Sequence, residues 1–511
     1  YWSGYYFLSN KKIKNDMKKI IYIFSLFITV IGLLGSCINL ESESYDSINT
    51  TIFPTNADDA DALVIAAAYG PFRADGYSGL FQCAKGGLAS NTDMSTDLLD
   101  CKWGDSWWPA VLQLNFTATS DIPTSFYGTW ANHIGKMTLT LDRISGIDMK
   151  EEEKTRLIAE TRCGRGWLAY ILYDLYGPIQ IPSLEVLQNP TQKVIVPRSS
   201  KEETVKLIED DLKAAAEVLP AKYSKSDENF GRFTKGLAYT VLMKLYMHEK
   251  EWGKAVECGR EVMKCGYSLV TNYKDIFTLD NEGNDEMIFS CIETRGVNEQ
   301  MWHAHVLPSN YPTTNPNIQK WNGYRMPWQF YHSFDPKDKR LEVICSEYVG
   351  TDGVTYNETN PGEYLDKGAL PIKYGEDLTQ TSENSEVDVV VYRYADVLTL
   401  MAEALARSNN AVTQEAVDRL NDVHTRAGLA AYQLSDFTSL DDFLRAVLKE
   451  RGHELWGEGC RRSDLIRYGL YIDYAIKYKG STTAKEYMNL MPLPQSVITE
   501  SSGQVIQNEG Y

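Results

Sequence analysis

The sequence predicts a mostly α-helical protein whose helical scaffold is interrupted by one loop-rich insertion carrying short strands. Apolar residues recur at helical spacing over long segments on both sides of the middle of the chain. Between them, residues 266–380 are rich in Asn, Asp, Gly, Pro and Tyr and lose that spacing. The composition, with 43% hydrophobic and 23% charged residues, is that of a globular protein.

The N-terminal half carries the clearest helical signals. Apolar residues line one face through residues 128–176. At 200–203 the sequence SKEE is a capping box, and Pro220 ends the helix that the box begins. Residues 235–266 form two expected helices joined by a turn at the sequence EKEW. This pair resembles a tetratricopeptide-like unit, so we expect a tetratricopeptide-like helical-repeat scaffold.

Helical spacing returns in the last third of the chain, at 393–405, 412–426 and 440–468. Gly428 follows the second of these segments, where a glycine commonly ends a helix. Long loops inside a compact domain are usually functional. The insertion at 266–380 is therefore a place where we expect ligand contacts.

The amino-terminal residues predict export. A basic start, MKK at 17–19, precedes the apolar run 20–34, and the sequence LGSC ends at Cys37. This order is typical of a bacterial signal peptide, and LGSC resembles a lipobox in which Cys37 is lipidated. The apolar run is shorter than the roughly 20 residues of a membrane span. An ordinary secretory signal with a chance cysteine is the alternative. Residues 1–16, upstream of the signal, look like a non-native extension.

Charge and cysteine content exclude some classes of function. The formal net charge is −18, whereas binding a nucleic-acid backbone requires clustered Lys and Arg, so we expect no nucleic-acid partner. The nine cysteines show no CxxC pair with zinc-site spacing, so no structural metal is expected. No EF-hand-like loop occurs, and no cofactor is expected, although loop oxygens leave bound calcium open.

Four segments of the C-terminal third, in this order, resemble the motifs of the SusD/RagB family of outer-membrane nutrient-binding lipoproteins. They are RYADVLTLMAEAL (393–405), LNDVHTRAGL (420–429), ERGHELWGEGCRRSDLIRYG (450–469), and LP followed by QNEGY (493–511). In the N-terminal half, ETRCGRGWLAY (160–170) and GRFTKG (231–236) resemble family motifs more loosely.

The resemblance implies a cell-surface lipoprotein of the outer membrane that binds oligo- or polysaccharide without catalysis. It also implies a partner, a TonB-dependent SusC-like transporter, to which the glycan is delivered. The expected organisation is the extension (1–16), a lipoprotein signal peptide (17–36), an N-terminal SusD-like region with tetratricopeptide-like helices (37–265), the ligand-binding insertion (266–380) and a SusD/RagB signature region (381–511).

Two other functions are weighed against glycan capture. A secreted glycoside hydrolase would use two carboxylates across an open cleft. The acidic residues of 450–469 are interleaved with arginines at i,i+3 and i,i+4 spacing, where opposite charges meet on one helix face. This pattern favours an ion-pair lattice that joins helices over a catalytic carboxylate pair. A helical-repeat adaptor for peptide or protein cargo is the second alternative.

The resemblance implies a glycan site on exposed loops of the early mature chain and of the middle insertion. Aromatic side chains there are the candidate contacts, because loops lie at the surface and sugar rings stack on flat faces. We expect two or three of them to form a stacking arc, with polar neighbours bonding hydroxyls and the remaining rings packing loops on the helices. The candidates are Trp103, Asp105, Trp107, Trp302, Trp321, Asn322, Tyr324, Arg325 and Trp328, with Asp93 as a further polar contact.

His303 and His305 form a rival constellation. At i,i+2 on a strand they would share one face and could begin a metal site. No third ligand is placed by the sequence, so a structural role is favoured.

Overall fold

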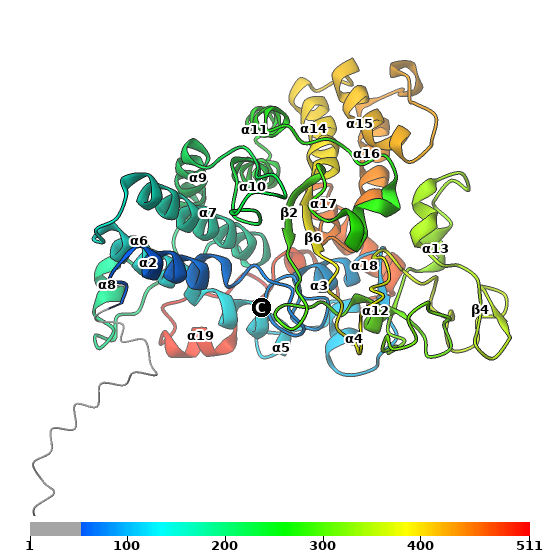
Figure 1. The fold of residues 1–511 in the computed structure, drawn as a ribbon, viewed down its shortest axis with the longest axis horizontal. Helices are drawn as coiled ribbons and strands as arrows, with labels where there is room; N and C mark the ends of the chain where they lie inside the picture. The colour runs from blue at the N-terminus through cyan, green and yellow to red at the C-terminus, as the bar shows by residue number, and fades with distance from the viewer. Residues whose placement is uncertain (1–52) are drawn as a thin grey trace, which may run out of the picture. The chain divides into compact units, whose positions relative to one another are not determined.

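The computed structural model describes residues 53–511 (Figure 1). The expected extension (1–16), the signal peptide (17–36) and the lipidation site Cys37 lie outside these residues. Within the described part, helices dominate and strands are few and short, which confirms the predicted fold class. The two domain boundaries that the sequence analysis placed after residue 53, at 265/266 and 380/381, both fall within one compact unit, residues 54–511.

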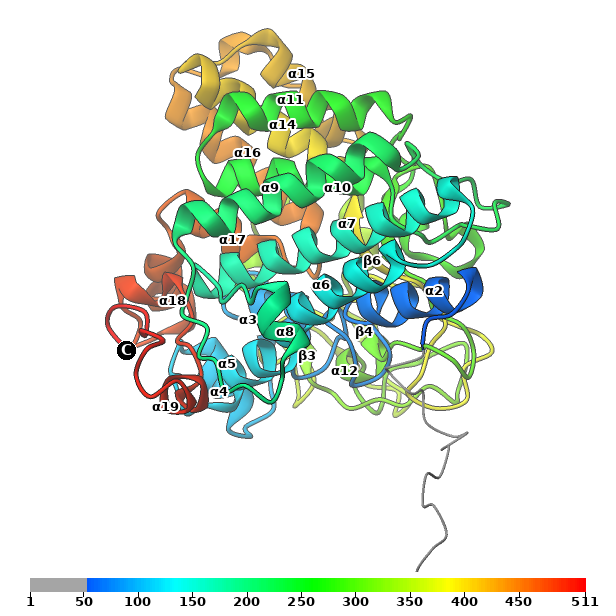
Figure 2. The same ribbon diagram turned by 90° about the vertical axis from the view of Figure 1, so that its left-hand side faces the viewer.

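The scaffold is a tetratricopeptide-like array of antiparallel helices in which each helix packs on the next (Figure 2). The contacts run from α6 to α7, α9, α10, α11 and α14, and α14 also packs on α15 and α16. The bounds are α6 Asn132–Ser145, α7 Glu151–Tyr176, α9 Lys201–Val218, α10 Lys235–His248, α11 Trp252–Lys264, α14 Tyr394–Asn409, α15 Gln414–Arg426 and α16 Leu440–Leu455.

Local signals explain the ends of these helices. The hydroxyl of Ser200 accepts a hydrogen bond from the Glu203 backbone N–H at 3.1 Å, and the Glu203 carboxylate accepts one from the Ser200 backbone N–H at 2.7 Å. The predicted capping box therefore begins α9. That helix ends at Val218, two residues before Pro220. Lys250, with φ of 61°, forms the turn between α10 and α11. These three predictions are confirmed.

Helices also occur before residue 128, earlier than the sequence predicted. These segments have between three and eight residues, which is too short to show a helical period. They are α2 (Ala57–Val64), α3 (Leu88–Met94), α4 (Trp107–Leu112) and α5 (Asp121–Pro123). Further short helices are α8 (Leu184–Gln188), α12 (Trp302–Val306), α13 (Trp328–Tyr331), α17 (Arg461–Arg467), α18 (Tyr471–Lys479) and α19 (Gln495–Glu500).

The named strands form three antiparallel pairs. β1 (Asp100–Cys101) pairs with β3 (Tyr324–Arg325), β2 (Met287–Cys291) with β6 (Val389–Arg393), and β4 (Tyr348–Val349) with β5 (Thr355–Tyr356). β6 leads directly into α14, whose N-cap is Arg393. The β1–β3 pair joins the loop-rich segment to the N-terminal part of the chain, and β2–β6 joins it to the strand that leads into α14, whereas β4–β5 lies within the segment.

The expected single helical region at 440–468 is broken in two. Gly457 and Gly459 have φ of 77° and 78°, in the left-handed region that favours glycine, and they separate α16 from α17. The expectation that the charges of 450–469 lie on one helix face was therefore wrong. The expected ion-pair lattice is present and joins different elements, as in Arg451–Asp464, although Asp464–Arg467 lies within α17.

A buried ion-pair lattice holds the C-terminal region together. Glu454, which is fully buried, contacts Arg393, Arg426 and Arg340, the last at 3.0 Å. Burial acts to raise the pKa of Glu454, but the three guanidinium groups outweigh it and hold that pKa at about 2. Three further pairs extend the lattice: Arg451–Asp464 and Arg451–Asp396 at 2.8 Å, and Arg467–Glu403 at 2.7 Å.

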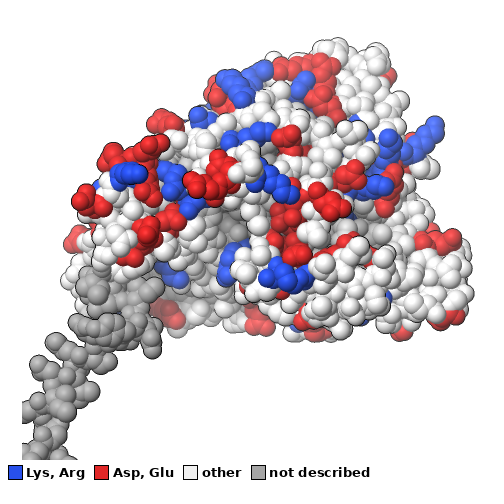
Figure 3. All heavy atoms as spheres, in the orientation of Figure 1, with Lys and Arg blue, Asp and Glu red and all other residues white. Residues whose placement is uncertain are grey.

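At the surface, acidic and basic side chains are interspersed on the face shown in Figure 3. Some form exposed pairs along one helix, such as Lys206–Asp210 at 2.8 Å. Among the residues from 53 onward, no helix combines the length and apolar character needed to cross a bilayer. The eight cysteines in this part of the chain are all free thiols.

Candidate functional site

The two loop segments that the sequence singled out lie together. β1 pairs with β3, so that Asp100 is opposite Arg325 and Cys101 is opposite Tyr324. The Lys102 backbone N–H continues this pairing with a 3.0 Å hydrogen bond to the carbonyl oxygen of Gly323. α4 contacts β1, and α12 contacts β3. Residues separated by more than 200 positions thereby form one surface.

A cluster of aromatic rings surrounds the buried ring of Tyr324. Its centroid lies 5.7 Å from Trp103, 5.3 Å from Trp108, 5.9 Å from Trp302 and 5.0 Å from His305. The geometries are tilted or edge-to-face, which aromatic pairs prefer. The cluster is therefore a packed support for the rings at its outer side.

Trp103 and Trp321 are the outer rings, and both are partly exposed. They flank His305, with centroids 5.4 and 5.0 Å from its ring. The Trp103 indole N–H donates to the carbonyl oxygen of Trp321 at 3.1 Å. Gly323 lies against the Trp103 ring, because a Cβ on Gly323 would come within 2.4 Å of Trp103 Cζ2. The Trp103 indole is thus fixed by a hydrogen bond and by close packing. We name the two side chains, Trp103 and Trp321, the tryptophan platform.

Four of the nine candidate residues are buried and cannot meet a ligand in this conformation. Trp107 donates to Asn91 Oδ1 at 2.8 Å, and Trp302 donates to the Pro371 carbonyl oxygen at 2.8 Å. Tyr324 and Arg325 are fully buried as well. The three aromatic side chains are buried in the core beneath the loops, and Arg325 is buried there with hydrogen-bond partners, so all four support the platform.

Arg325 links three segments of this region. Its guanidinium donates to the carbonyl oxygens of Val306 at 2.8 Å and Tyr364 at 2.5 Å, and to the side-chain oxygen of Asn322. Burial lowers the pKa of Arg325 to about 10, which leaves it charged at neutral pH. It therefore holds the end of α12, the turn at Asn322 and the loop at Tyr364 in register.

The remaining candidates keep exposed surface. Asn322 has φ of 56° and is partly exposed beside Trp321. Asp105 forms a 3.0 Å ion pair with Lys85 in which the two side chains are 40% and 48% exposed. Trp328, also partly exposed, donates to the carbonyl oxygen of Leu365 at 3.0 Å. These groups could add polar contacts and a further ring around the platform.

Asp93 does not face solvent, contrary to expectation. It is fully buried and accepts from the backbone N–H of Gly457 at 2.8 Å and of Gly459 at 3.1 Å. Burial raises the pKa of Asp93 to about 7 despite these bonds. Its role is to fasten α3 to the glycine turn between α16 and α17.

The two histidines lie on helix α12 and not on a strand, so the strand prediction was wrong. His303 bonds the carbonyl oxygen of Tyr374 at 2.8 Å, and His305 bonds that of Met301 at 2.8 Å. Burial lowers the pKa of His305 to about 4, so its ring is neutral. Across the described residues, no three His, Cys, Asp or Glu side chains are grouped to hold a metal.

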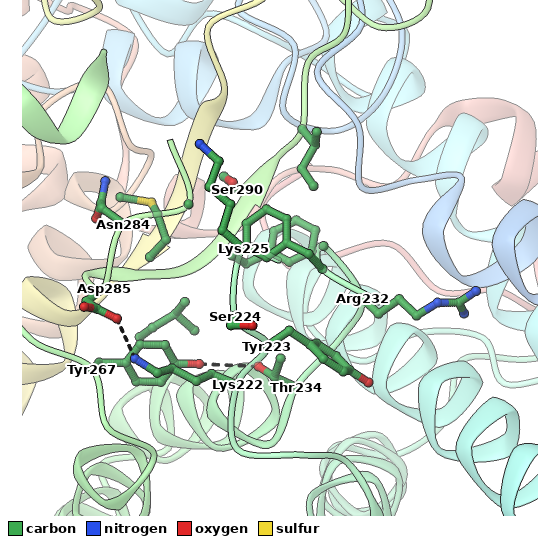
Figure 4. A pocket seen from close by; sticks show the side chains of 17 residues that line it. Lys222, Tyr223, Ser224, Lys225, Arg232, Thr234, Tyr267, Asn284, Asp285 and Ser290 are labelled. Atoms are coloured by element: carbon green, nitrogen blue, oxygen red, sulfur yellow. Dashed lines mark hydrogen bonds and ion pairs between the residues drawn. The ribbon is translucent and has the colours of Figure 1, made fainter. Parts of the chain in front are cut away.

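A separate hollow of about 380 Å³, which the sequence did not suggest, lies between the 222–234 loop and β2 (Figure 4). Its rim includes Lys222, bound to Asp285 at 2.7 Å, and Tyr267. Met287, Ile288 and other apolar side chains line it. No motif marks it, because its lining comes from three separated segments.

The fold and the platform together define a class: helical-scaffold binding proteins that present aromatic side chains from packed loops. The C-terminal part of the chain, residues 320–511, matches the model of the SusD family, and residues 77–247 match the model described as starch-binding associating with outer membrane. Together these matches cover more than half of the chain. The chain belongs to the SusD/RagB family.

Individual relatives agree with this assignment. A SusD-like protein of Formosa agariphila is 25% identical over 426 residues, covering 73% of this chain and 77% of the relative. The starch-binding protein SusD of Bacteroides thetaiotaomicron is 22% identical over 491 residues, covering 82% and 84%. One similar solved structure is that of surface glycan-binding protein A from Bacteroides thetaiotaomicron in complex with laminarihexaose. It shares the fold with a TM-score of 0.72 at 18% sequence identity, and the match covers 89% of this chain and 100% of that one.

Proposed function

We propose that this protein is a non-catalytic, cell-surface lipoprotein that captures an oligo- or polysaccharide on the tryptophan platform. The observation that carries the proposal is the pair of partly exposed indoles, Trp103 and Trp321, which lie over a packed aromatic cluster, with the Trp103 N–H bonded to the backbone carbonyl of Trp321. Membership of a family whose relatives include starch- and glycan-binding proteins supports it.

The chemistry of the platform suits sugars. Ligand sites combine apolar and aromatic surface with a few placed polar groups. Here the flat indole faces would stack on sugar rings, while Asn322 and Asp105 beside them would bond hydroxyls. Since the Trp103 ring is fixed before binding, little of its side-chain entropy is lost when a ligand stacks on it.

The family also supports a membrane location and a transporter partner. We propose that lipidation of Cys37 anchors the chain in the outer membrane, facing outward, and that the captured glycan passes to a TonB-dependent SusC-like transporter. An affinity-tagged copy, purified in mild detergent from its host, should bring down a barrel protein. Recovery of the tagged chain alone across several detergents, with its locus induced, would favour a free-standing binder.

A glycoside hydrolase is the main competing function. The carboxylates of 450–469 that suggested it are committed to arginines: Glu454 and Asp464, for example, are buried within the ion-pair lattice. A peptide-binding adaptor is the other alternative, and the exposed indoles favour sugar over it.

Isothermal titration against a panel of polysaccharides, with reducing-end release measured in parallel, separates the three functions. We expect binding of at least one polysaccharide and no release of reducing ends. Release that disappears when one carboxylate is substituted would establish a hydrolase. Binding of peptides but of no glycan would establish an adaptor.

A further inference from the structure

A second hollow, distinct from the tryptophan platform, lies between α13, α16 and α18, with a volume of about 530 Å³. Figure 1 shows these three helices around the same part of the molecule. We propose that this hollow is a second saccharide-binding site that takes an uncharged oligosaccharide. The inference rests on the proposed function, because it assigns to the same chain another site for the same class of ligand.

The base of the hollow is polar and already organised. Arg461 forms a bidentate pair with Asp97, at 2.9 and 2.8 Å, and both side chains are buried. His453 shares a 2.8 Å hydrogen bond with the Ser333 hydroxyl, and its ring stacks on Phe334 at 3.9 Å. A ligand would thus rest on a floor whose polar groups already have partners.

The wall is aromatic. Phe330, Tyr468 and Tyr474 line the hollow together with Tyr478, and the rings of Tyr474 and Tyr478 meet edge-to-face at 4.8 Å. Tyr474 and Tyr478 are one helical turn apart on α18, so both can face the same ligand. Such a wall offers ring faces to the apolar faces of a sugar.

The rim carries polar groups that remain free for a ligand. Within residues 53–511, the side chains of Gln329, Lys449 and Tyr474 make no hydrogen bond or ion pair. Arg445 and Asp441 form only an exposed pair, at 2.7 Å with exposures of 77% and 71%, which is weak in water. The opening therefore offers both donors and acceptors.

This mixture identifies the ligand class. Sugar hydroxyls both donate and accept, so they can use Lys449 and Gln329 as well as Asp441. The charges of the lining are close to balanced, because Asp97 is paired with Arg461 and Asp441 with Arg445, which leaves Lys449 as the one charged side chain of the lining without a partner among residues 53–511. An anion would therefore gain a single ion pair, and a lipid chain would meet a polar floor. An uncharged oligosaccharide can use both the ring faces and the polar rim.

The two sites can serve one polymer. Trp321 of the platform and Gln329 of the rim are eight residues apart, so their Cα atoms lie within roughly 29 Å of each other. Occupation of one site then raises the effective concentration of the same chain at the other, which strengthens binding of polymers more than of short oligosaccharides.

The test compares wild type, a rim variant (Gln329→Ala with Lys449→Ala) and a platform variant (Trp103→Ala with Trp321→Ala). Lys337→Ala, an exposed lysine outside the hollow, is the matched control. Titration uses laminarihexaose, maltohexaose, cellohexaose and xylohexaose, and the polymer of whichever hexasaccharide binds. We expect two hexasaccharides per wild-type chain, one per rim variant and one per platform variant.

For the polymer, the rim variant should bind at least about tenfold more weakly than wild type and the control. A stoichiometry of one for wild type, with polymer affinity unchanged in the rim variant, would overturn the second site and leave the proposed function intact. Binding of none of the four oligosaccharides or their polymers would defeat both. Tyr478→Phe, which keeps the ring and removes the hydroxyl, should retain stacking and bind within a few fold of wild type.

Discussion

The indole nitrogen of Trp103 donates a 3.1 Å hydrogen bond to the carbonyl oxygen of Trp321, which is 218 residues further along the chain. This bond joins the loop after β1 to the segment before β3, and it fixes the Trp103 ring against the backbone of Trp321. The platform therefore depends on tertiary pairing and not on either loop alone.

Gly323→Ala tests the packing beneath the platform. The added Cβ would come within 2.4 Å of the Trp103 ring and 2.8 Å of the His305 carbonyl oxygen, so the ring must move. We expect a loss of about 1–3 kcal/mol of stability and weaker glycan binding. Gly104→Ala is the matched control, because nothing lies within 4 Å of its Cβ. Equal glycan affinity in both variants, measured by titration, would contradict a fixed Trp103.

Asp464→Ala tests the ion-pair lattice as scaffold. Asp464 accepts from Arg451 and Arg467, each at 2.8 Å, and all three are well buried. Removing the carboxylate takes one ion-pair partner from each of Arg451 and Arg467, and we expect the free energy of unfolding to fall by about 3–5 kcal/mol. The exposed Asp210→Ala should cost under about 0.5 kcal/mol. Thermal unfolding measures both, and an unchanged melting temperature with lost glycan binding would place Asp464 in the site instead.

The buried carboxyl group of Glu293 should make the stability of the protein depend on pH. It is 6% exposed, and its Oε2 has no hydrogen-bond partner among residues 53–511. Burial, followed by the charge of Asp388, raises the pKa of Glu293 to about 9 from 4.5. The folded state therefore keeps a proton that the unfolded state releases, so this group lowers the unfolding free energy as pH rises from about 4.5 to 9.

Glu293→Gln removes this titration and keeps the shape of the side chain. We expect the variant to lose less stability than wild type between pH 5.5 and pH 8.5, as measured by calorimetry. Parallel pH profiles for the two proteins would show that Glu293 is not protonated in the folded state.

Cys37→Ser tests the anchor. Lipid chains attached at Cys37 would hold the chain at the membrane, whereas a serine at this position accepts none. We expect the variant to fold but to leave the outer-membrane fraction in cells that lack the partner transporter. Continued fractionation with the outer membrane in those cells would argue against lipidation at Cys37.

The scaffold was predictable because its signals are local. Ser200 and Glu203 lie three residues apart and begin α9 on their own, and the motif at 393–405 corresponds to the end of β6 and most of α14. The break at Gly457 and Gly459 was missed because i,i+3 and i,i+4 charge spacing continues across it. The arginines and carboxylates of this stretch instead meet partners on other helices.

The site was predictable only in part, for a physical reason. Aromatic residues in loops mark both exposed platforms and buried support, and sequence alone does not separate Trp321 from Trp302 or Tyr324. Their separation depends on the β1–β3 pairing, and strands of two residues carry no periodic signal. The hollow between α13, α16 and α18 was missed because its lining is spread along the chain.

The central claim is that the tryptophan platform binds glycan, and titration of the Trp103→Ala/Trp321→Ala variant tests it most directly. The ligand is the polysaccharide that wild type binds, and the partly buried Trp130→Ala on the scaffold side is the control. Loss of a central aromatic contact typically costs about 2 kcal/mol or more, roughly thirtyfold in affinity. We predict at least that loss for the platform variant, with circular dichroism unchanged and the control binding as wild type does. Wild-type affinity in the folded platform variant would contradict the account.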